Sequence, residues 1–153
     1  MRLVVGLGNP GSEFVGTRHN VGWEALDELA ARLGWIGKKD EFNRLGRSKF
    51  DGITLDGSMS IHSGGTEKVL LLKPTTYMND SGRSVQSAMA FYQLSPAEVM
   101  VLLDDLALPP ALLDGLQAHV PAVELVRVPG ATHWIVHERP DLIAQEIERS
   151  LAS

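Results

Sequence analysis

The stretch that decides the fold is Leu3-Val4-Val5-Gly6-Leu7-Gly8-Asn9-Pro10-Gly11, which Thr17-Arg18-His19-Asn20 follows closely. Its aliphatic residues run without polar alternation, a pattern typical of a strand that is buried on both faces. The glycines and the proline then end the strand and begin a loop. In an open α/β sheet the ligand crevice lies beyond the carboxyl ends of the parallel strands, so Asn9 and His19 lie where chemistry is expected.

The residue types in this loop suit either hydrolysis or simple turn formation. A neutral imidazole such as that of His19 can take a proton from water near neutral pH, and an amide such as that of Asn9 can donate to a developing oxyanion. A single Asn in a loop is more often a turn residue, and a single His can merely neighbour a helix. These two residues alone leave both interpretations open.

The glycines of the loop also match the G-x-G-x-x-G pattern of dinucleotide-binding folds. That pattern must open directly into a helix, with an acidic residue ending a second strand about twenty residues later. Here the next helical pattern begins only near Asn20, and Asp27 and Glu28 lie inside it. We therefore expect no dinucleotide at this loop and no cofactor.

Four blocks of sequence, in order along the chain, carry a resemblance to a known family. The chain is similar to bacterial peptidyl-tRNA hydrolase over about residues 1–110. The blocks are Gly6-Leu7-Gly8-Asn9-Pro10-Gly11, Thr17-Arg18-His19-Asn20-Val21-Gly22, Lys73-Pro74-Thr75-Thr76-Tyr77-Met78-Asn79 and Asp104-Asp105-Leu106-Ala107-Leu108-Pro109.

The resemblance implies a role for each matching residue. His19 would be the general base that activates water against the ester joining a peptide to the 3′ end of tRNA. Asp104 would accept a hydrogen bond from the other ring nitrogen and so fix the imidazole tautomer. Asn9 and Asn79 would position substrate and stabilise the oxyanion, with Met78 as a wall of the pocket.

Some of these residues also have a purely structural interpretation. Asp104 could cap the turn that follows it, and Asn79 could help to start a helix at Ser81. Phe14, which we count among the substrate-binding residues, stands where the family usually has Tyr. Asp80 stands where the family usually has an apolar residue, and it adds negative charge beside the predicted site.

The composition describes one globular domain, which we take as residues 1–153. The chain is 44% hydrophobic and 22% charged, has no cysteine, and shows neither a membrane span nor a signal peptide, so we expect a cytoplasmic protein. Its formal charge is −5, and residues 101–153 hold three Lys/Arg against eight Asp/Glu. Such an acidic segment is a poor surface for tRNA. The basic residues cluster instead at Lys38, Lys39, Arg44, Arg47 and Lys49.

Hydrophobic patterns predict alternating strands and helices. After the first strand, we expect further strands at Ser48–Leu55, near Met59–Ile61, and at Glu67–Lys73, Val99–Leu103 and Val123–Val128, with turns at Gly57, Gly64 and Gly65. We expect helices at Asn20–Leu33, Ser81–Leu94, Ala111–His119 and Pro140–Leu151. This alternation predicts a three-layer α/β sandwich with a mixed, mostly parallel sheet and helices on both faces.

The last part of the chain departs from the family pattern. The glycine-rich segment with a His-Asn pair, expected after Pro110, is absent, and residues 111–153 resemble the C-terminal segment of an α/β-hydrolase through Pro129-Gly130-Ala131-Thr132-His133-Trp134. In that family His133 would be the triad base, but the chain has no G-x-S-x-G, so we expect His133 to lie in an inherited loop without a catalytic role. His133 and His137 also lack a clear third ligand, so we expect no metal.

These observations predict a chimera, either engineered or recombined, with a partial peptidyl-tRNA hydrolase site. We expect weak or no activity, weak binding of peptidyl-tRNA, no membrane partner and a monomer. One alternative is a protein made for its fold, with no evolved activity. Another is an unspecialised esterase that uses His19 or His133 with Asp104.

Overall fold

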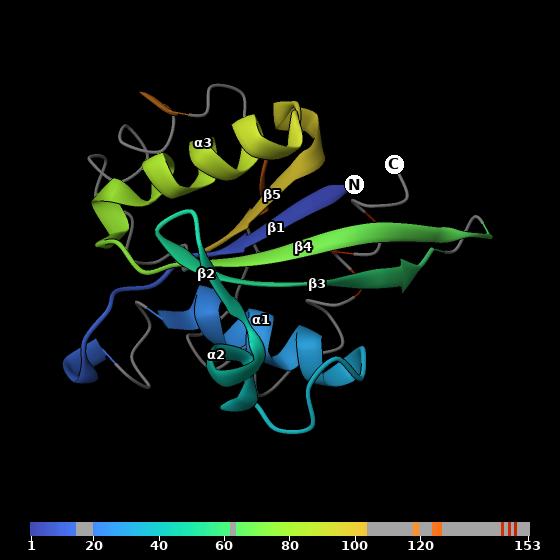
Figure 1. The fold of residues 1–153 in the computed structure, drawn as a ribbon, viewed down its shortest axis with the longest axis horizontal. Coiled ribbons are helices and arrows are strands. Elements are labelled where there is room, and N and C mark those ends of the chain that lie inside the picture. Colours follow the sequence, from blue (N-terminus) through green and yellow to red (C-terminus); the bar gives the residue numbers. More distant parts are fainter. Residues whose placement is uncertain are drawn as a thin grey trace.

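A six-stranded sheet runs through the part of the chain that the computed structural model describes (Figure 1). The described residues are 1–14, 20–61, 64–103, 118–119, 124–126, 145, 147 and 149. The strand order is β2-β3-β4-β1-β5-β6. The strands are β1 (Arg2–Gly6), β2 (Arg47–Lys49), β3 (Gly52–Ser60), β4 (Thr66–Pro74), β5 (Val99–Leu102) and β6 (Glu124–Val126).

The sheet is mixed, with its parallel part at the centre. β1 is parallel to both β4 and β5, and β5 is parallel to β6. β3 pairs antiparallel with β4 and with β2, which forms a short edge of three exposed residues. The predicted mixed, mostly parallel α/β sheet is therefore confirmed.

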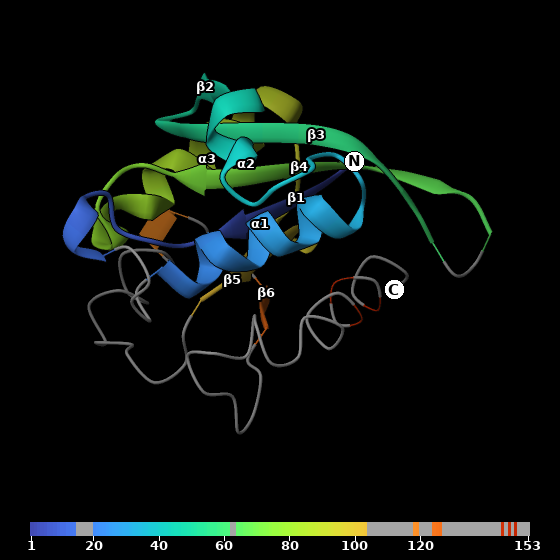
Figure 2. The ribbon, with the colours of Figure 1, turned by 90° about the horizontal axis from the view of Figure 1, so that it is seen from below.

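Helices cover both faces of the sheet, as predicted. α1 (Val21–Arg32) and α2 (Glu41–Leu45) lie on one face, and α3 (Ser81–Tyr92) lies on the other. Figure 2 looks onto the face that α1 covers. Short 3-10 turns are η1 (Ser12–Phe14), η3 (Met78–Asp80) and η4 (Pro96–Glu98).

Each face of the sheet has its own hydrophobic cluster. On the α1 face, Val4 and Leu71 pack with Leu26 and Phe42 in a cluster that also contains the buried Ile147. On the α3 face, a second set of strand residues packs against the helix: Leu3, Val5, Leu70, Leu72 and Val101 with Val85 and Ala88. Because alternate residues of a central strand enter different clusters, β1 needs apolar residues at successive positions.

Most long elements lie where the sequence predicts them. The strands that become β1, β4 and β5 and the helices that become α1 and α3 are confirmed to within about two residues. β6 lies inside the predicted strand Val123–Val128, and Ala118 and His119 are helical within the predicted Ala111–His119. The rest of the predicted helix at 111–119 and most of the one at 140–151 lie outside the described residues.

The region from residue 37 to 61 differs from the prediction. No strand spans Ser48–Leu55, because a two-residue turn at Phe50 and Asp51 separates β2 from β3. Gly57 lies inside β3 rather than in a turn, and a Cβ there would come within 2.4 Å of the Trp35 ring. The helix α2 was not predicted. The predicted turns at Gly64 and Gly65 are confirmed, with φ of 83° and 146°.

Across the described ranges, no helix is long and apolar enough to cross a membrane.

Candidate active site

Three neighbouring strands end at one edge of the sheet and lead into the predicted site. β4, β1 and β5 are adjacent and parallel, so their carboxyl ends face the same way. Asn9 follows β1, and Asn79 lies in η3 after β4. Asp104 follows β5 directly after Leu103 but lies outside the described residues. This edge is where an α/β sheet places its ligands.

The loop after β1 is held by two hydrogen bonds. Leu7 N donates to Leu102 O over 3.0 Å, which ties the loop to the end of β5. Asn9 N donates to the side-chain oxygen of Asn20 over 2.8 Å. Asn20 is buried and directly precedes α1, so its amide joins the backbone of Asn9 to the start of the helix. The residue just before Asn20 in the chain is His19.

Close packing of α1 on these strand ends explains the glycines of the loop. A Cβ at Gly22, in the first turn of α1, would come within 2.4 Å of Leu7 N and 2.5 Å of Leu102 O. A Cβ at Gly8 would come within 2.6 Å of the Trp23 ring. The chain also passes through residues 7–20 before α1 begins, so the loop does not open directly into a helix as a dinucleotide fingerprint requires.

The second predicted binding segment follows β4. Asn79 is exposed, and Asp80 N donates to Tyr77 O over 2.9 Å. The carboxylate of Asp80, predicted to add negative charge beside the site, is paired with Arg83 at 3.1 Å. The segment therefore carries less uncompensated charge than the sequence suggested.

Most of the predicted site residues lie outside the part of the chain that the structure describes. His19, Asp104 and His133 lie outside the described residues, as do the side chains of Phe14 and Met78. Of the six predicted site residues, the structure thus describes Asn9 and Asn79 fully. Their roles, and those of the other four, stay predictions.

Two buried polar atoms near this edge lack a hydrogen-bond partner within the described ranges. They are the indole nitrogen of Trp23, whose ring lies against Gly8, and the hydroxyl of Thr76, two residues after β4. A buried polar group without a partner costs free energy unless water or a ligand satisfies it. Over the same ranges, no group of three His, Asp or Glu side chains could hold a metal ion.

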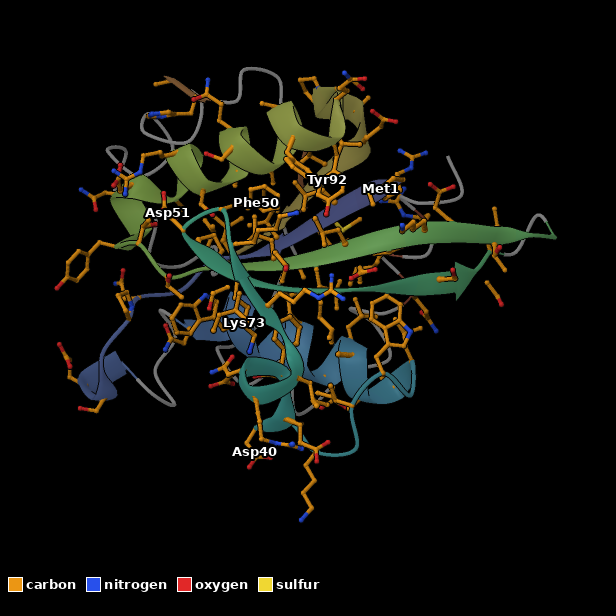
Figure 3. The ribbon with its side chains drawn as sticks, in the orientation of Figure 1. Met1, Asp40, Phe50, Asp51, Lys73 and Tyr92 are labelled. Atoms are coloured by element: carbon orange, nitrogen blue, oxygen red, sulfur yellow. The ribbon has the colours of Figure 1, made fainter. Side chains whose placement is uncertain are left out.

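A buried ion pair lies behind the strand ends on the α1 face. Lys73, the residue before the last of β4, binds the carboxylate of Asp27 from α1, and its Nζ lies 4.3 Å from the centre of the Phe42 ring (Figure 3). Burial lowers the pKa of Lys73 and raises the pKa of Asp27, and in both cases it outweighs the attraction between the two charges.

Sequence reasoning missed two of these arrangements. The Asn9–Asn20 hydrogen bond had a signal, since both residues stand in the matched blocks, but spacing alone does not show which side chains meet. The burial of Lys73 also had a signal, because a lysine that ends an apolar strand must find a partner if it faces the core. The identity of that partner depends on the packing of α1.

The fold, with polar residues after neighbouring parallel strands, defines an α/β class of protein that includes many enzymes. Comparison with known proteins identifies the family. The model of the family described as Peptidyl-tRNA hydrolase matches residues 3–115. This chain belongs to the peptidyl-tRNA hydrolase family.

Known relatives agree with this assignment. The peptidyl-tRNA hydrolase of Bradyrhizobium diazoefficiens is 50% identical over 110 residues, which are 72% of this chain and 48% of the relative. That of Rhodopseudomonas palustris strain BisA53 is 50% identical over 113 residues, 74% of this chain and 50% of the relative. The chain thus spans about half the length of the curated relatives it matches.

Solved structures extend the similarity in fold. The structure of peptidyl-tRNA hydrolase from Acinetobacter baumannii at 1.00 Å resolution matches with a TM-score of 0.63 and 27% identity, over 97% of this chain and 83% of that chain. A complex of peptidyl-tRNA hydrolase with N-propanol matches with a TM-score of 0.66 and the same identity and coverage.

The prediction of an engineered chimera with weak or no activity is wrong. Relatives about half identical are natural peptidyl-tRNA hydrolases, the family match continues past the predicted junction at residue 110, and the fold match covers 97% of the chain. The same finding contradicts the two alternative predictions, which were a protein made for its fold and an unspecialised esterase. The comparisons give no support to an α/β-hydrolase segment. β6 continues the sheet beside β5 in parallel, as the predicted alternation of strands and helices requires.

Proposed function

We propose that this protein hydrolyses the ester between a peptide and the 3′ end of tRNA. The observation that carries the proposal is the family match over residues 3–115, which includes all four sequence blocks. The arrangement of β4, β1 and β5 adds support, because the blocks with Asn9 and Asn79 follow adjacent parallel strands. We take residues 1–153 as one domain and the cytoplasm as its location.

In the proposed mechanism His19 acts as the general base. It takes a proton from water as the water oxygen bonds to the ester carbonyl carbon, and the carbonyl oxygen becomes an oxyanion. Asp104 accepts from the other ring nitrogen and stabilises the imidazolium that forms. The bond between the carbonyl carbon and the 3′ ribose oxygen then breaks, and that oxygen takes the proton held by the His19 imidazolium. The peptide leaves as a carboxylic acid, which loses its own proton to water.

The remaining predicted residues bind and orient the substrate. The amides of Asn9 and Asn79 donate to the oxyanion or hold the water, which lowers the barrier only if the donors are already in place. The Asn9–Asn20 hydrogen bond supports this role, since it holds the backbone of Asn9 beside the chain position that follows His19. Phe14 and Met78 form apolar walls beside the peptide.

The test compares His19→Gln with the wild type on an N-acetylated aminoacyl-tRNA. Loss of a general base lowers kcat by about 10²- to 10⁴-fold. His62→Gln is the matched control, because His62 lies outside the four sequence blocks, and it should keep wild-type turnover. Full activity of His19→Gln would overturn the assigned mechanism. Absence of turnover by the wild type would overturn the proposed function.

A further inference from the structure

The turn between β2 and β3 is strained. Phe50 and Asp51 have φ of 57° and 50°, and Lys49 pairs with Gly52 across the turn. Two-residue hairpin turns with positive φ at both positions strongly prefer Asn-Gly, and a bulky residue such as Phe is an outlier there. Such strain persists only where surrounding contacts override it, and it concentrates at functional sites.

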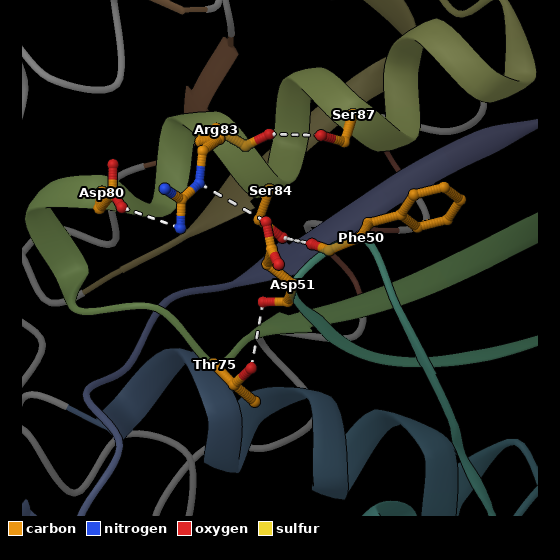
Figure 4. Close-up of polar contacts among 7 residues, drawn as sticks. All are labelled: Phe50, Asp51, Thr75, Asp80, Arg83, Ser84 and Ser87. Carbon is orange, nitrogen blue, oxygen red and sulfur yellow. Dashed lines mark hydrogen bonds and ion pairs between the residues drawn. The ribbon is translucent and has the colours of Figure 1, made fainter.

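Both backbone carbonyls of this turn accept hydrogen bonds from the segment that follows β4 (Figure 4). Ser84 Oγ donates to Phe50 O over 2.5 Å, and Ser84 is fully buried in the first turn of α3. Thr75 donates to Asp51 O twice, from its N over 2.9 Å and from its Oγ1 over 3.1 Å. The turn therefore holds residues 75 and 84, which flank the segment between them.

The segment between Thr75 and Ser84 contains η3 and therefore Asn79. Arg83 adds a weaker connection, since its guanidinium lies 3.1 Å from Asp80 and 3.5 Å from Asp51. These ion pairs are exposed, and exposed pairs contribute little. The hydrogen bonds of Thr75 and Ser84 thus provide most of the connection.

The turn is also fixed to the far end of α3. The Phe50 ring lies 5.4 Å from that of Phe91 and 5.9 Å from that of Tyr92, centre to centre. Lys49 Nζ lies 3.8 Å from the centre of the Phe91 ring, a favourable cation–π distance. The β2–β3 turn contacts α3 at both the first and the last turn of the helix. The β2–β3 turn therefore cannot relax unless the helix moves.

We infer that Thr75 and Ser84 are positioning residues, whose hydrogen bonds to the strained β2–β3 turn hold Asn79 at the end of β4. This inference rests on the proposed function, in which the amide of Asn79 donates to the oxyanion or holds the attacking water. The turn itself contacts α3 and the start of the 75–84 segment. A donor to the oxyanion acts in the transition state, so displacement of Asn79 should lower turnover rather than substrate binding.

The test uses Thr75→Val, which removes the hydroxyl and keeps the size and the backbone donor. Because Thr75 is exposed, the variant should fold. We expect kcat to fall about tenfold, with KM changed by less than about twofold, since small misplacement of a substrate-orienting group costs rate. Thr75→Ser, which restores the hydroxyl, should recover wild-type kcat.

Ser87→Ala is the matched control, because Ser87 Oγ donates only within α3, to Arg83 O over 2.9 Å. It should leave kcat unchanged. Hydrogen exchange gives a second measurement that does not depend on activity: the backbone amides of residues 76–80 should exchange faster in Thr75→Val than in Ser87→Ala.

Each outcome decides the inference. A raised KM with unchanged kcat, or unchanged kinetics and exchange, would overturn it. If the wild type fails to cleave peptidyl-tRNA, the proposed function falls, and faster exchange in Thr75→Val would still show that the turn holds the segment. Unchanged exchange in that case would overturn both.

Discussion

The two faces of the sheet hold the loops after β1 and β4 by different physical means. On the α1 face, the loop after β1 is fixed by backbone packed directly against backbone at Gly22, with the ion pair of Lys73 and Asp27 buried nearby. On the α3 face, the loop after β4 is fixed by hydrogen bonds and exposed ion pairs to a strained turn. Steric contacts depend little on salt, whereas the exposed ion pairs of Arg83 weaken as the salt concentration rises. The packing at Gly22 should therefore be the less sensitive to salt.

The largest effect should come from the buried ion pair. Asp27→Ala leaves the ammonium of Lys73, which is 3% exposed, without its carboxylate, so we expect a loss of about 3–5 kcal/mol in the free energy of unfolding. Urea denaturation measures this loss. Burial shifts the pKa values of both partners against their charged forms, so the double variant Asp27→Leu/Lys73→Met should be nearly as stable as the wild type. If Asp27→Ala lowered the free energy of unfolding by less than about 1 kcal/mol, that result would contradict our interpretation of the pair as desolvated.

Gly22→Ala tests the backbone packing of α1. Its Cβ would meet Leu7 N and Leu102 O at 2.4 and 2.5 Å, so backbone must move, and we expect a loss of about 3 kcal/mol. Gly37→Ala is the control, because its Cβ would meet only the Glu41 carboxylate, at 3.2 Å and at the end of a flexible side chain. Equal melting temperatures for the two variants would show that α1 can shift away from β1 without cost.

Arg83→Gln tests the polar contacts on the other face. It removes the ion pairs to Asp51 and Asp80, both about half exposed, and should cost no more than about 0.5 kcal/mol. The cost should shrink further in high salt, because screening weakens exposed pairs. A loss that exceeds that of Gly22→Ala would reverse the comparison between the two faces.

The smallest effect concerns the exposed end of α2. The backbone N–H groups of Gly37 and Lys38 donate to Glu41 and lower the pKa of its carboxyl. A lowered pKa in the folded state contributes stability above the ordinary pKa of the group and loses it as pH falls through the lowered value. Glu41→Gln should therefore be slightly less stable than the wild type at pH 7, and acid denaturation curves of the two should converge. A difference that grows toward low pH would contradict this assignment.

Sequence patterns predicted the strands and helices that bury a long apolar run or stripe. They failed for the short elements, which bury no such run. β1, β4 and α3 have long apolar runs or stripes, which allow few alternatives. The region around α2 has only short elements, and the turn lies at Phe50 and Asp51, one residue before the position that the Asp51-Gly52 dipeptide, a common turn signal, would predict. Gly57 was predicted to mark a turn, but it lies within β3. Glycine is needed there because a side chain would collide with the Trp35 ring.

The sequence predicted which loops form the site, but it did not predict which side chains contact one another there. The blocks placed Asn9 and Asn79 after neighbouring strands because the order of strands and helices determines which ends meet. The bond from Asn9 to Asn20 and the bonds from the Phe50–Asp51 turn depend on side-chain directions that one sequence does not reveal. The foreign segment was predicted from the missing glycine-rich segment after Pro110 and from the resemblance of residues 129–134 to an α/β-hydrolase, but so short a motif match is weak evidence of a separate origin.

The edge strand β2 has a further consequence for how copies of this protein behave in crowded solution. An unpaired strand edge invites another chain to extend the sheet, and long, flat, apolar edges lead to aggregation. β2 presents only three residues, all exposed, and two of them are Arg47 and Lys49. A second molecule docking here would gain few backbone hydrogen bonds and would meet positive charge, so growth of the sheet into a fibril is disfavoured on this side.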